Sequence, residues 1–378
     1  MKVLIEARSL AAKSGGVRRY TEELIISVVE HGGAEYEVLL GRHLGKRNFS
    51  NIKQHVLPLA HDFLLPYWLQ YQVPSFLKTM DVDLVHFTKA DVPRRLATPS
   101  VVTVYDIIPW LLPRTQSFTR RFYWRGALAR SVTESRHIFT ISQAAARDLT
   151  RHFDVDENRI TVTPLAVNIN HFYRRQGAEV ESVQRRLGIL GPYILFVGTR
   201  DKRKNLKALI SAWTRISDDV PHRLVIVGRK AAATDGSERV VGRLGMESRV
   251  TFLEDVSYTD LPAVYSGASV MVWPSIIEGW GLPPQEALAC GTPVIVSDGD
   301  PLPEVVGSAG DVVPFSFQDL QRRFDDVDFI DRLAQRILEV LGQTQDPMLR
   351  LERVCQASKG TWADVASLTL EGYKKAVS

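Results

Sequence analysis

Short runs of apolar residues recur along the chain, each followed by a loop or by a longer stretch with helical spacing. The runs do not alternate between apolar and polar positions, which is typical of strands covered on both faces in a parallel sheet. Strands that alternate with helices predict an α/β chain of two doubly wound, Rossmann-like domains. The expected strands form two series, one at 3–5, 37–40, 84–87, 101–104 and 137–140, the other at 193–197, 224–227, 249–252, 269–273 and 293–296.

The break between the two series is a polar, charged stretch, which marks a domain boundary. We place the boundary after residue 175, so that an N-terminal domain covers 1–175 and a C-terminal domain covers 176–360. The last segment, 361–378, is predicted to be a helix because its apolar residues recur at helical spacing. Parallel sheets bind ligands at the carboxyl ends of their strands. Chemistry is therefore expected in the loops after the strands, where two such sheets face each other across a cleft.

The composition is that of an ordinary globular protein. Apolar residues make up 45% and charged residues 24% of the 378, which excludes a disordered or collagen-like chain. The two cysteines, Cys290 and Cys355, have no partner at the spacing of a zinc site and are too few for a disulfide framework. The sequence shows no signal-peptide core and no apolar run of membrane-spanning length. We expect a cytoplasmic protein whose contact with a membrane, if it makes one, is peripheral.

The charge is unevenly distributed. Of the 47 Lys and Arg and the 43 Asp and Glu, residues 1–175 hold 24 and 16, and the remaining residues hold 23 and 27. The basic half contains an apolar stretch at 63–69 and a segment in which arginines interleave with aromatic residues. These are Arg114, Phe118, Arg120, Arg121, Phe122, Tyr123, Trp124, Arg125 and Arg130. Such a surface suits an anionic membrane or a lipid-diphosphate acceptor better than nucleic acid, because no nucleic-acid motif accompanies it. An exposed basic helix with its aromatic side in the core is the alternative.

Two loops after predicted strands have features of anion sites. Gly15, Gly16 and Val17 follow the first strand, and paired glycines let backbone N–H groups approach an anion at the start of a helix. A plain turn is the alternative, and the loop lacks the G-x-G-x-x-G pattern of a dinucleotide oxidoreductase. Gly198 follows the strand at 193–197, and four cations come within the next six residues. These cations could clamp a diphosphate, or they could simply be solvated.

The loop after the fourth strand of the second series is the most informative. Two prolines mark the start of a helix, so Glu278 lies in the loop and Glu286 lies in the opening turns of that helix. Gly279 and Gly281 free the backbone, which lets the N–H groups of Gly281 and Leu282 point at an anion. Carboxylates on both sides of a phosphate site suit a ligand with hydroxyls at both ends, such as a nucleotide sugar. A capping glutamate and a surface glutamate are the alternative.

This loop and helix resemble the signature of a known family. Glu278 and Glu286 form an E-x7-E pair within EGWGLPPQEALACGTPVI, which is similar to the signature of the family 4 retaining glycosyltransferases of the GT-B fold. The resemblance extends over nearly the whole chain. Other similar segments are the glycine loop at 14–21, residues 196–206, 224–228, 250–253 and 265–268, and the final helix, which in this fold crosses back to the N-terminal domain.

The resemblance implies roles for individual residues. Arg203, Lys204 and Glu278 are expected to form the catalytic group, with the two cations on the donor diphosphate and Glu278 on hydroxyls of the transferred sugar. Glu286 is expected to bind the ribose. The full expected donor-binding set is Gly15, Gly16, Gly198, Arg203, Lys204, Glu278, Gly279, Gly281, Leu282 and Glu286. Cations and helix N-termini can stabilise a leaving diphosphate without a metal, so no metal or further cofactor is expected beyond a GDP- or UDP-linked sugar.

On the acceptor side, the resemblance points to Val17, Tyr105 and Asp106. Many family members carry a histidine in the loop after the strand at 101–104, near the transferred sugar, whereas this chain has Tyr105 and Asp106. Tyr105 can donate a hydrogen bond but cannot act as an imidazole. A metal-dependent transferase would need an Asp-x-Asp pair, and the four such spacings are interpreted as solvated turns, at 81/83, 154/156, 298/300 and 326/328.

The sequence therefore predicts a retaining, metal-independent glycosyltransferase that moves a hexose to a glycan or lipid-linked acceptor in surface polysaccharide synthesis. Mannose is favoured because the glycine loop and the stretch at 105–109 resemble those of bacterial mannosyltransferases. The expected partners are a nucleotide sugar, a glycan or lipid-diphosphate-linked acceptor and the inner-membrane surface, and nucleic acid is not among them. The alternatives are a nucleotide-sugar epimerase of similar fold and a protein that binds polyanions or membrane surfaces.

Overall fold

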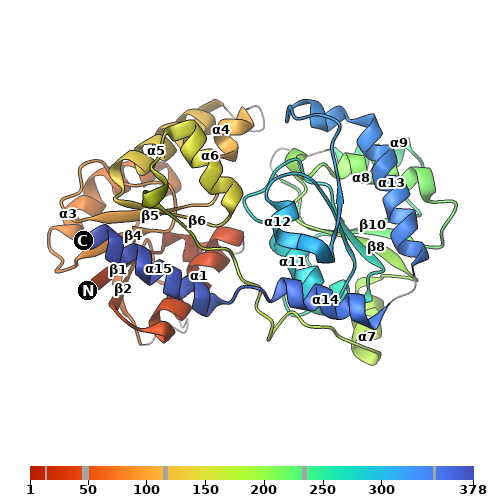
Figure 1. Cartoon of the computed structure of the whole chain (residues 1–378), viewed down its shortest axis with the longest axis horizontal. Helices are drawn as coiled ribbons and strands as arrows, with labels where there is room; N and C mark the ends of the chain where they lie inside the picture. The colour runs from red at the N-terminus through yellow and green to blue at the C-terminus, as the bar shows by residue number, and fades with distance from the viewer. Residues whose placement is uncertain (13–14, 45–50, 114–117, 232–235, 344–345) are drawn as a thin grey trace. The chain divides into compact units, whose positions relative to one another are not determined.

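The computed structural model describes residues 1–12, 15–44, 51–113, 118–231, 236–343 and 346–378, with the side chains of 62 and 118–122 excepted. The chain divides into two compact units (Figure 1). Unit 1 consists of Met1–Leu165 and Gly360–Ser378, and unit 2 consists of Ala166–Lys359.

Unit 1 is built on a parallel sheet in the order β3-β2-β1-β4-β5-β6-β7. All pairings between its strands are parallel, with Leu4 opposite Glu37 on one side and opposite Val85 on the other. The predicted strands are present, and the edge strands β3 and β7 were missed because they contain few buried residues. The strands are β1 (Lys2–Glu6), β2 (Glu35–Leu40), β3 (Lys53–Val56), β4 (Leu84–Phe87), β5 (Ser100–Val104), β6 (His137–Thr140) and β7 (Ile160–Val162).

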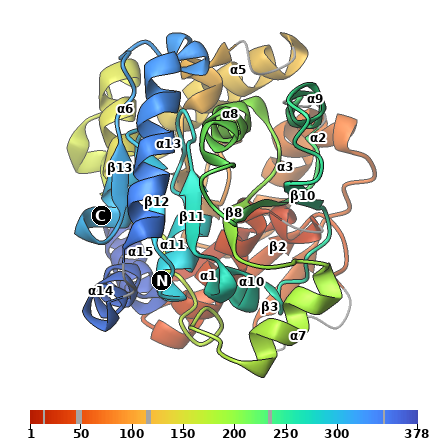
Figure 2. The same ribbon diagram turned by 90° about the vertical axis from the view of Figure 1, so that its right-hand side faces the viewer.

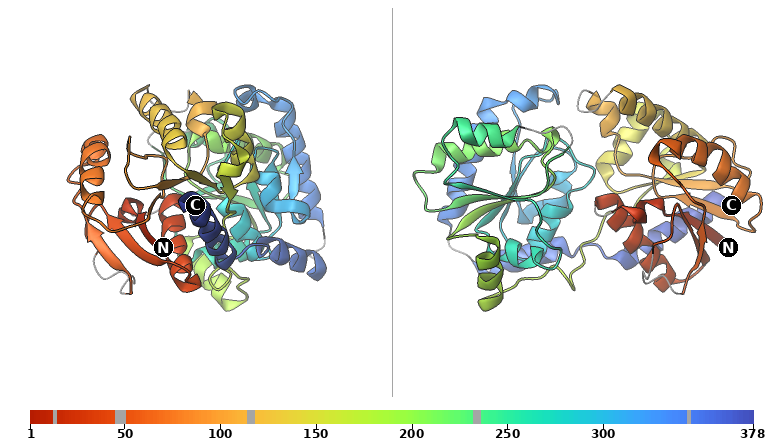
Figure 3. Two further views of the ribbon diagram at one scale, coloured as in Figure 1. Left: turned by 60° about the vertical axis from the view of Figure 1, so that its left-hand side comes forward. Right: turned by 180° about the vertical axis from the view of Figure 1, so that it is seen from behind.

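Helices cover both faces of this sheet. On one face, a buried cluster joins Leu4 and Val102 to Trp68, Leu128 and Leu149. On the other face, α15 lies beside α1 (Figures 1 and 3). The longer helices are α1 (Gly16–His31), α5 (Phe118–Glu134), α6 (Gln143–Phe153) and α15 (Trp362–Val377), and the short ones are η1 (Arg8–Ala11), η2 (Asp62–Leu64), α2 (Leu65–Tyr67), η3 (Trp68–Gln72), α3 (Val73–Leu77), α4 (Ile108–Leu111) and η5 (Glu157–Arg159).

The terminal helix α15 follows unit 2 in the sequence but packs on unit 1. Thr361 begins it with a capping box that also involves Asp364. At its other end, the buried hydroxyl of Tyr373 lies 2.7 Å from Nδ1 of His86 on β4. Gly372 lets the helix approach the sheet, because a Cβ there would lie 2.4 Å from the ring of Phe139. Close packing and one buried polar contact therefore fix the helix on unit 1.

Unit 2 repeats the architecture with a six-stranded parallel sheet in the order β10-β9-β8-β11-β12-β13. The strands are β8 (Tyr193–Val197), β9 (Arg223–Val227), β10 (Val250–Leu253), β11 (Val270–Trp273), β12 (Val294–Ser297) and β13 (Asp311–Val313). In Figure 2, α8 and α13 lie side by side over this sheet. The helices are α7 (Ala178–Leu187), η6 (Lys202–Lys204), α8 (Leu206–Ile216), α9 (Ser237–Arg243), α10 (Leu261–Gly267), α11 (Leu282–Ala289), α12 (Leu302–Val306), η7 (Gly307–Ala309), η8 (Arg322–Asp325), α13 (Val327–Gly342) and α14 (Pro347–Ala357).

The division after Leu165 precedes the position that composition suggested. Residues 166–175 belong to unit 2 because they pack on α10. The rings of Phe172 and Tyr265 lie 6.0 Å apart, and the backbone N–H of Arg175 donates to Oγ of Ser266 over 2.9 Å. The predicted fold class, two doubly wound parallel sheets with helices on their faces, is confirmed.

Candidate active site

The loop after β8 places two cations at the carboxyl end of the sheet. Gly198 is required at its start, because a Cβ there would lie 2.6 Å from the ring of Trp273. The carboxylate of Asp201 accepts the backbone N–H of Arg203 over 2.8 Å and caps the short turn Lys202–Lys204. Asn205 then takes a left-handed conformation, with φ at 53°, and α8 begins. This tight turn directs Arg203 and Lys204 toward the loop after β11.

Glu278 pairs with both of these cations. Its Oε1 accepts a hydrogen bond from Nζ of Lys204 over 2.6 Å, and its Oε2 accepts one from Nη1 of Arg203 over 2.5 Å. Nη1 of Arg203 also donates to the carbonyl of Ile277 over 2.7 Å. Lys204 and Glu278 are each only 9% exposed. The sequence-predicted catalytic group is therefore brought together as a buried cluster of two positive charges and one negative charge.

Trp273 at the end of β11 organises this cluster, and sequence reasoning missed it. Its indole Nε1 donates to Oε1 of Glu278 over 3.2 Å, and the ammonium of Lys204 lies 4.5 Å from the centre of its ring. The ring stacks on Phe196, with the centroids 5.0 Å apart. The available signal was its place as the last residue of a buried strand that leads into the site loop, where side chains reach ligands.

The electrostatics keep Glu278 ionised. Burial by itself would raise its pKa, but the charges of Arg203 and Lys204 outweigh burial and lower the pKa of Glu278 from its ordinary 4.5 to about 2. Burial and the neighbouring Arg203 lower the pKa of Lys204, while Glu278 opposes this shift. The cluster therefore holds a carboxylate that accepts hydrogen bonds and two cations placed to meet phosphate oxygens.

This pKa shift predicts how stability depends on pH. Because the pKa of Glu278 is lower in the folded chain than in the unfolded chain, its contribution to stability is complete above about pH 4.5 and is lost as the pH falls toward 2. Urea unfolding between pH 5 and pH 3 is expected to show a steeper fall in the free energy of unfolding for the natural chain than for Glu278→Gln. Equal slopes would contradict the prediction.

The start of α11 provides backbone donors near Glu278 in the sequence. Gly281 caps the helix with φ at 133°, and a Cβ there would lie 2.9 Å from the side chain of Leu302. Pro283 and Pro284 have no N–H, so the N–H groups at this helix end come from Gly281 and Leu282. The loop that leads to the helix, including Gly279, is held by the N–H of Glu278, which donates to the carbonyl of Asp300 over 2.8 Å.

Glu286 lies one turn further along α11 and is 5% exposed. Its Oε2 accepts a hydrogen bond from the hydroxyl of Tyr265 on α10 over 2.8 Å. Tyr265 is a second residue that sequence reasoning did not assign to the site. The two members of the E-x7-E pair therefore have different partners, cations for Glu278 and a tyrosine hydroxyl for Glu286.

The run of four cations after β8 is divided by the fold. Arg200 is only 1% exposed and pairs with the carboxylates of Glu238, over 2.9 Å, and Glu254. Lys202 is exposed. The clamp suggested by four clustered cations is thus reduced to the two that contact Glu278. The buried Arg200 instead pairs with two half-exposed carboxylates elsewhere in unit 2.

The remaining predicted residues lie in unit 1. Gly15, with φ at 127°, caps α1, and among the described residues beyond the chain neighbours and the helix's own backbone no atom lies within 4 Å of where a Cβ would stand at Gly15 or Gly16. Val17, Tyr105 and Asp106 line one cavity of about 280 Å³. The hydroxyl of Tyr105 donates to the carbonyl of Thr88 over 2.7 Å, and the carboxylate of Asp106 accepts the N–H of Ile108 over 2.9 Å. Both side chains therefore have structural partners within unit 1.

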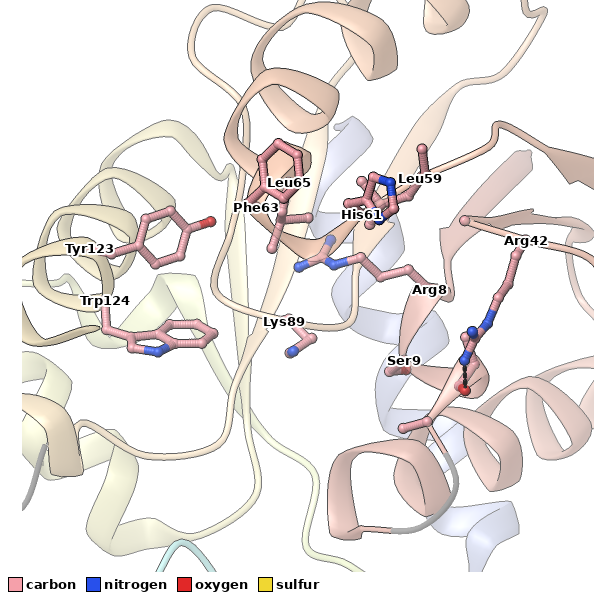
Figure 4. Close-up of a pocket in the computed structure, with 14 residues that line it drawn as sticks. Arg8, Ser9, Arg42, Leu59, His61, Phe63, Leu65, Lys89, Tyr123 and Trp124 are labelled. Atoms are coloured by element: carbon pink, nitrogen blue, oxygen red, sulfur yellow. Dashed lines mark hydrogen bonds between the residues drawn. The ribbon is translucent and has the colours of Figure 1, made fainter. Parts of the chain in front are cut away.

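A larger cavity of unit 1, about 1110 Å³, was not anticipated. Figure 4 shows Tyr123 and Trp124 of α5 turned toward Phe63 and Lys89. The ammonium of Lys89 lies 5.6 Å from the centre of the Trp124 ring. Tyr123 and Trp124 belong to the basic aromatic segment that was predicted to contact an anionic membrane or a lipid-diphosphate acceptor, and they line a cavity instead of forming an open surface. Arg114 and the side chains of 118–122 in that segment lie outside the described residues. The lining residues are Arg8, Ser9, Ala11, Ala12, Gly41, Arg42, Leu59, Ala60, His61, Phe63, Leu65, Lys89, Tyr123 and Trp124.

The described residues contain no group of three or more His, Cys, Asp or Glu side chains placed to hold a metal ion. Members of the Asp-x-Asp pairs have structural roles. Asp326 caps α13, Asp156 caps η5, and Asp298 accepts the N–H of Phe315 over 3.1 Å. Among the helices of the described ranges, none combines the length and the apolar character needed to cross a bilayer.

Comparison with known proteins matches both halves of the chain to glycosyltransferases. Glycosyltransferase Family 4 matches residues 14–171, and glycosyl transferases group 1 matches residues 185–327. O-antigen chain mannosyltransferase B of Escherichia coli is 29% identical over 75% of this chain and 71% of that protein. O-antigen chain mannosyltransferase RfbU of Salmonella typhimurium is 33% identical over 62% of this chain, and the match spans 61% of its own length.

Solved structures agree on the fold. Anabaena HepE in complex with UDP and glucose superposes with a TM-score of 0.73 at 18% identity, covering 99% of each chain. WaaG, a glycosyltransferase involved in lipopolysaccharide biosynthesis, superposes with a TM-score of 0.72 at 16% identity, covering 98% of this chain and 99% of that chain. The epimerase alternative gains no support from these matches. The chain belongs to the family 4 glycosyltransferases and has their GT-B fold.

Proposed function

We propose that this glycosyltransferase moves mannose, with retention, from a GDP- or UDP-linked donor to a glycan acceptor in the synthesis of a surface polysaccharide. The mannosyltransferases of Escherichia coli and Salmonella typhimurium that align with it support the sugar and the process. The observation that carries the donor site is the buried cluster of Arg203, Lys204 and Glu278 at the carboxyl ends of β8 and β11.

The cluster suits the loss of a nucleoside diphosphate. Arg203 and Lys204 would exchange their bonds to Glu278 for phosphate oxygens and neutralise charge as the bond to the sugar breaks. The N–H groups of Gly281 and Leu282 would add donors at the start of α11. Glu278, released from the cations, would accept hydrogen bonds from hydroxyls of the transferred sugar, and Glu286 would accept them from the ribose. No step in this scheme is assigned to a metal.

We place the acceptor in unit 1, at the larger cavity. Aromatic rings bind sugars through their apolar faces while polar groups at the rim fix orientation. Phe63, Tyr123 and Trp124 supply the rings. Arg8 adds little net charge, because it pairs with Glu6 over 2.7 Å and with Asp91 over 2.6 Å.

Replacement of Trp124 by alanine is expected to raise the KM for the acceptor about tenfold and to leave the KM for the donor unchanged, because the variant loses one stacked ring. Initial rates measured while each substrate is varied separately test this. Tyr173→Ala, which removes an exposed ring of unit 2 that does not line the cavity, is the matched control. An unchanged KM for the acceptor in Trp124→Ala would show that this cavity does not bind the acceptor.

A lipid-linked acceptor would bring unit 1 to a membrane surface. Phe63, Tyr67 and Tyr71 are 76%, 55% and 65% exposed, and the last two rings stack on each other. Exposed aromatic side chains of this kind partition into the lipid interface. Sedimentation with vesicles of anionic phospholipid at low salt is expected to remove the protein from solution. If the variant Phe63→Ala/Tyr67→Ala/Tyr71→Ala binds the vesicles as well as the natural chain does, the membrane contact lies elsewhere.

The proposed function is tested with a panel of donors. The purified enzyme is incubated with GDP-mannose, UDP-mannose, UDP-glucose or ADP-glucose and a lipid-linked oligosaccharide, and the product is analysed by mass spectrometry and by NMR at the anomeric centre. The expected product gains mannose with the α configuration of the donor sugar. Transfer of another hexose would refute the choice of mannose, and inversion would refute the mechanism.

A further inference from the structure

Unit 2 has a cavity of about 350 Å³ whose lining includes no residue of the proposed donor site. We name it the arginine cavity, because three of its lining residues are Arg174, Arg175 and Arg350. The other lining residues are Gln176, Gly177, Val180, Glu181 and Ser266.

The arginines come from two distant segments of the chain. Arg174 and Arg175 lie on the segment by which the chain enters unit 2, and Arg350 lies on α14, the last helix before it leaves unit 2. The backbone of Arg175 is fixed by its bond to Ser266. The stem of Arg350 lies on Gly291, where a Cβ would be 2.7 Å from Cγ of the arginine. Packing, and not an ion pair, therefore brings these side chains together.

The positive charge of the cavity is only partly compensated. Arg175 pairs with Glu179 over 3.2 Å, but neither Arg174 nor Arg350 forms an ion pair with a carboxylate of any described residue. Burial and the charge of Arg350 lower the pKa of Arg174. The lining includes a single carboxylate, that of the exposed Glu181. Like charges held close together favour the binding of an anion between them.

Two further features of the cavity favour an oxyanion. Nε of Arg175 and Nε of Arg350 are buried without a hydrogen-bond partner, and buried donors of this kind are normally satisfied by the protein, by water or by a bound ion. The ten-residue helix α7 also begins here. Its cap, Gly177, offers no side chain to the first N–H groups, so an anion can accept hydrogen bonds from them beside the carboxylates of Glu179 and Glu181 in the first turn.

We propose that the arginine cavity binds the phosphate group of a small ligand, either inorganic phosphate or a small phosphate ester. The planar guanidinium groups of Arg174 and Arg350 would each present paired donors to its oxygens. The volume is that of a small-molecule site, so an ester the size of a hexose phosphate is accommodated. The bound group would connect the incoming segment of unit 2 to α14. It would also raise the unfolding temperature, by an amount that grows with the logarithm of the ligand concentration relative to Kd.

The test is isothermal titration calorimetry with inorganic phosphate and, separately, with a hexose 6-phosphate, at constant ionic strength. The donor site also takes phosphate, so Lys204→Ala is measured beside Arg174→Ala/Arg350→Ala. We expect the double variant to bind at least tenfold more weakly than the natural chain, and Lys204→Ala to retain this binding. Tighter binding of the ester identifies an organic phosphate as the ligand, and equal binding identifies the phosphate group alone.

The matched control is Arg185→Ala/Arg239→Ala, which removes two exposed arginines of unit 2. Equal weakening in this control would show a general charge effect and would overturn the proposal, as would loss of the binding in Lys204→Ala or unchanged binding in Arg174→Ala/Arg350→Ala. Removal of Arg174 and Arg350 relieves repulsion, so without phosphate the variant is expected to unfold at no lower temperature than the natural chain. Failure of the phosphate-binding test would not affect the proposed transferase function, which the panel of donors tests separately.

Discussion

Glu278→Gln is expected to lower kcat by about a hundredfold to a thousandfold, the range observed when one preorganised electrostatic group of an active site is lost. The amide has nearly the shape of the carboxylate but carries no charge. It cannot compensate Arg203 and Lys204, which both bond to Glu278 in the buried cluster. It is also a weaker acceptor for the sugar hydroxyls that we assign to this position. Initial rates at saturating donor and acceptor measure the effect.

Two results would separate this loss from a loss of fold. Glu254→Gln removes a carboxylate that pairs with the buried Arg200 away from the proposed site, so this variant is expected to keep its turnover even where its stability falls. Thermal unfolding of Glu278→Gln should show one cooperative transition. A folded Glu278→Gln enzyme with near-natural turnover would show that the donor sugar lies elsewhere.

Lys204→Ala is expected to lower kcat/KM for the donor about a hundredfold, because a charge-assisted hydrogen bond to phosphate contributes roughly 1.5–3 kcal/mol. The variant also leaves Glu278 with Arg203 as the one remaining cation of the cluster, which draws Arg203 away from the diphosphate. The measurement is the dependence of the initial rate on donor concentration, with the KM for the acceptor expected to stay unchanged.

Lys202→Ala is the matched control, because Lys202 belongs to the same short turn but is exposed. A solvated cation contributes little at this distance in salt, so this variant is expected to behave as the natural enzyme. Equal losses in Lys202→Ala and Lys204→Ala would mean that the general charge of the turn, and not the buried ammonium, binds the donor.

Much of the fold could be predicted because strands that are buried on both faces of a sheet appear in the sequence as continuous apolar runs. Strands such as β8 are apolar throughout, and all ten expected strands occur in the two sheets. The strands β3, β7 and β13 were missed. They lie at sheet edges, where fewer positions are buried and the apolar run is interrupted. Edge strands depend on pairing with a neighbour, which a local pattern does not record.

The arrangement of the candidate site could be predicted where its residues are close in the sequence. The two prolines at the helix start placed Glu278 in a loop and Glu286 on a helix, and both positions are observed. Trp273 and Tyr265, which hold these two carboxylates, were not predicted, because an aromatic residue in a buried strand or helix has the same pattern whether it packs or donates a hydrogen bond. No local pattern predicted either that Arg200 forms ion pairs with Glu238 and Glu254 and so stays out of the cluster around Glu278.

The sequence by itself determined the α/β class, the two series of parallel strands and the family, because periodicity and motif spacing are local properties of the chain. Only the tertiary structure decided which two of the four neighbouring cations contact Glu278. It also decided which aromatic residues of the basic half line the larger cavity of unit 1, and that Arg174 and Arg350 line the same cavity of unit 2. Each of these depends on contacts between residues far apart in the sequence. Packing, burial and the pairing of charges select such contacts, and they act only once the chain is folded.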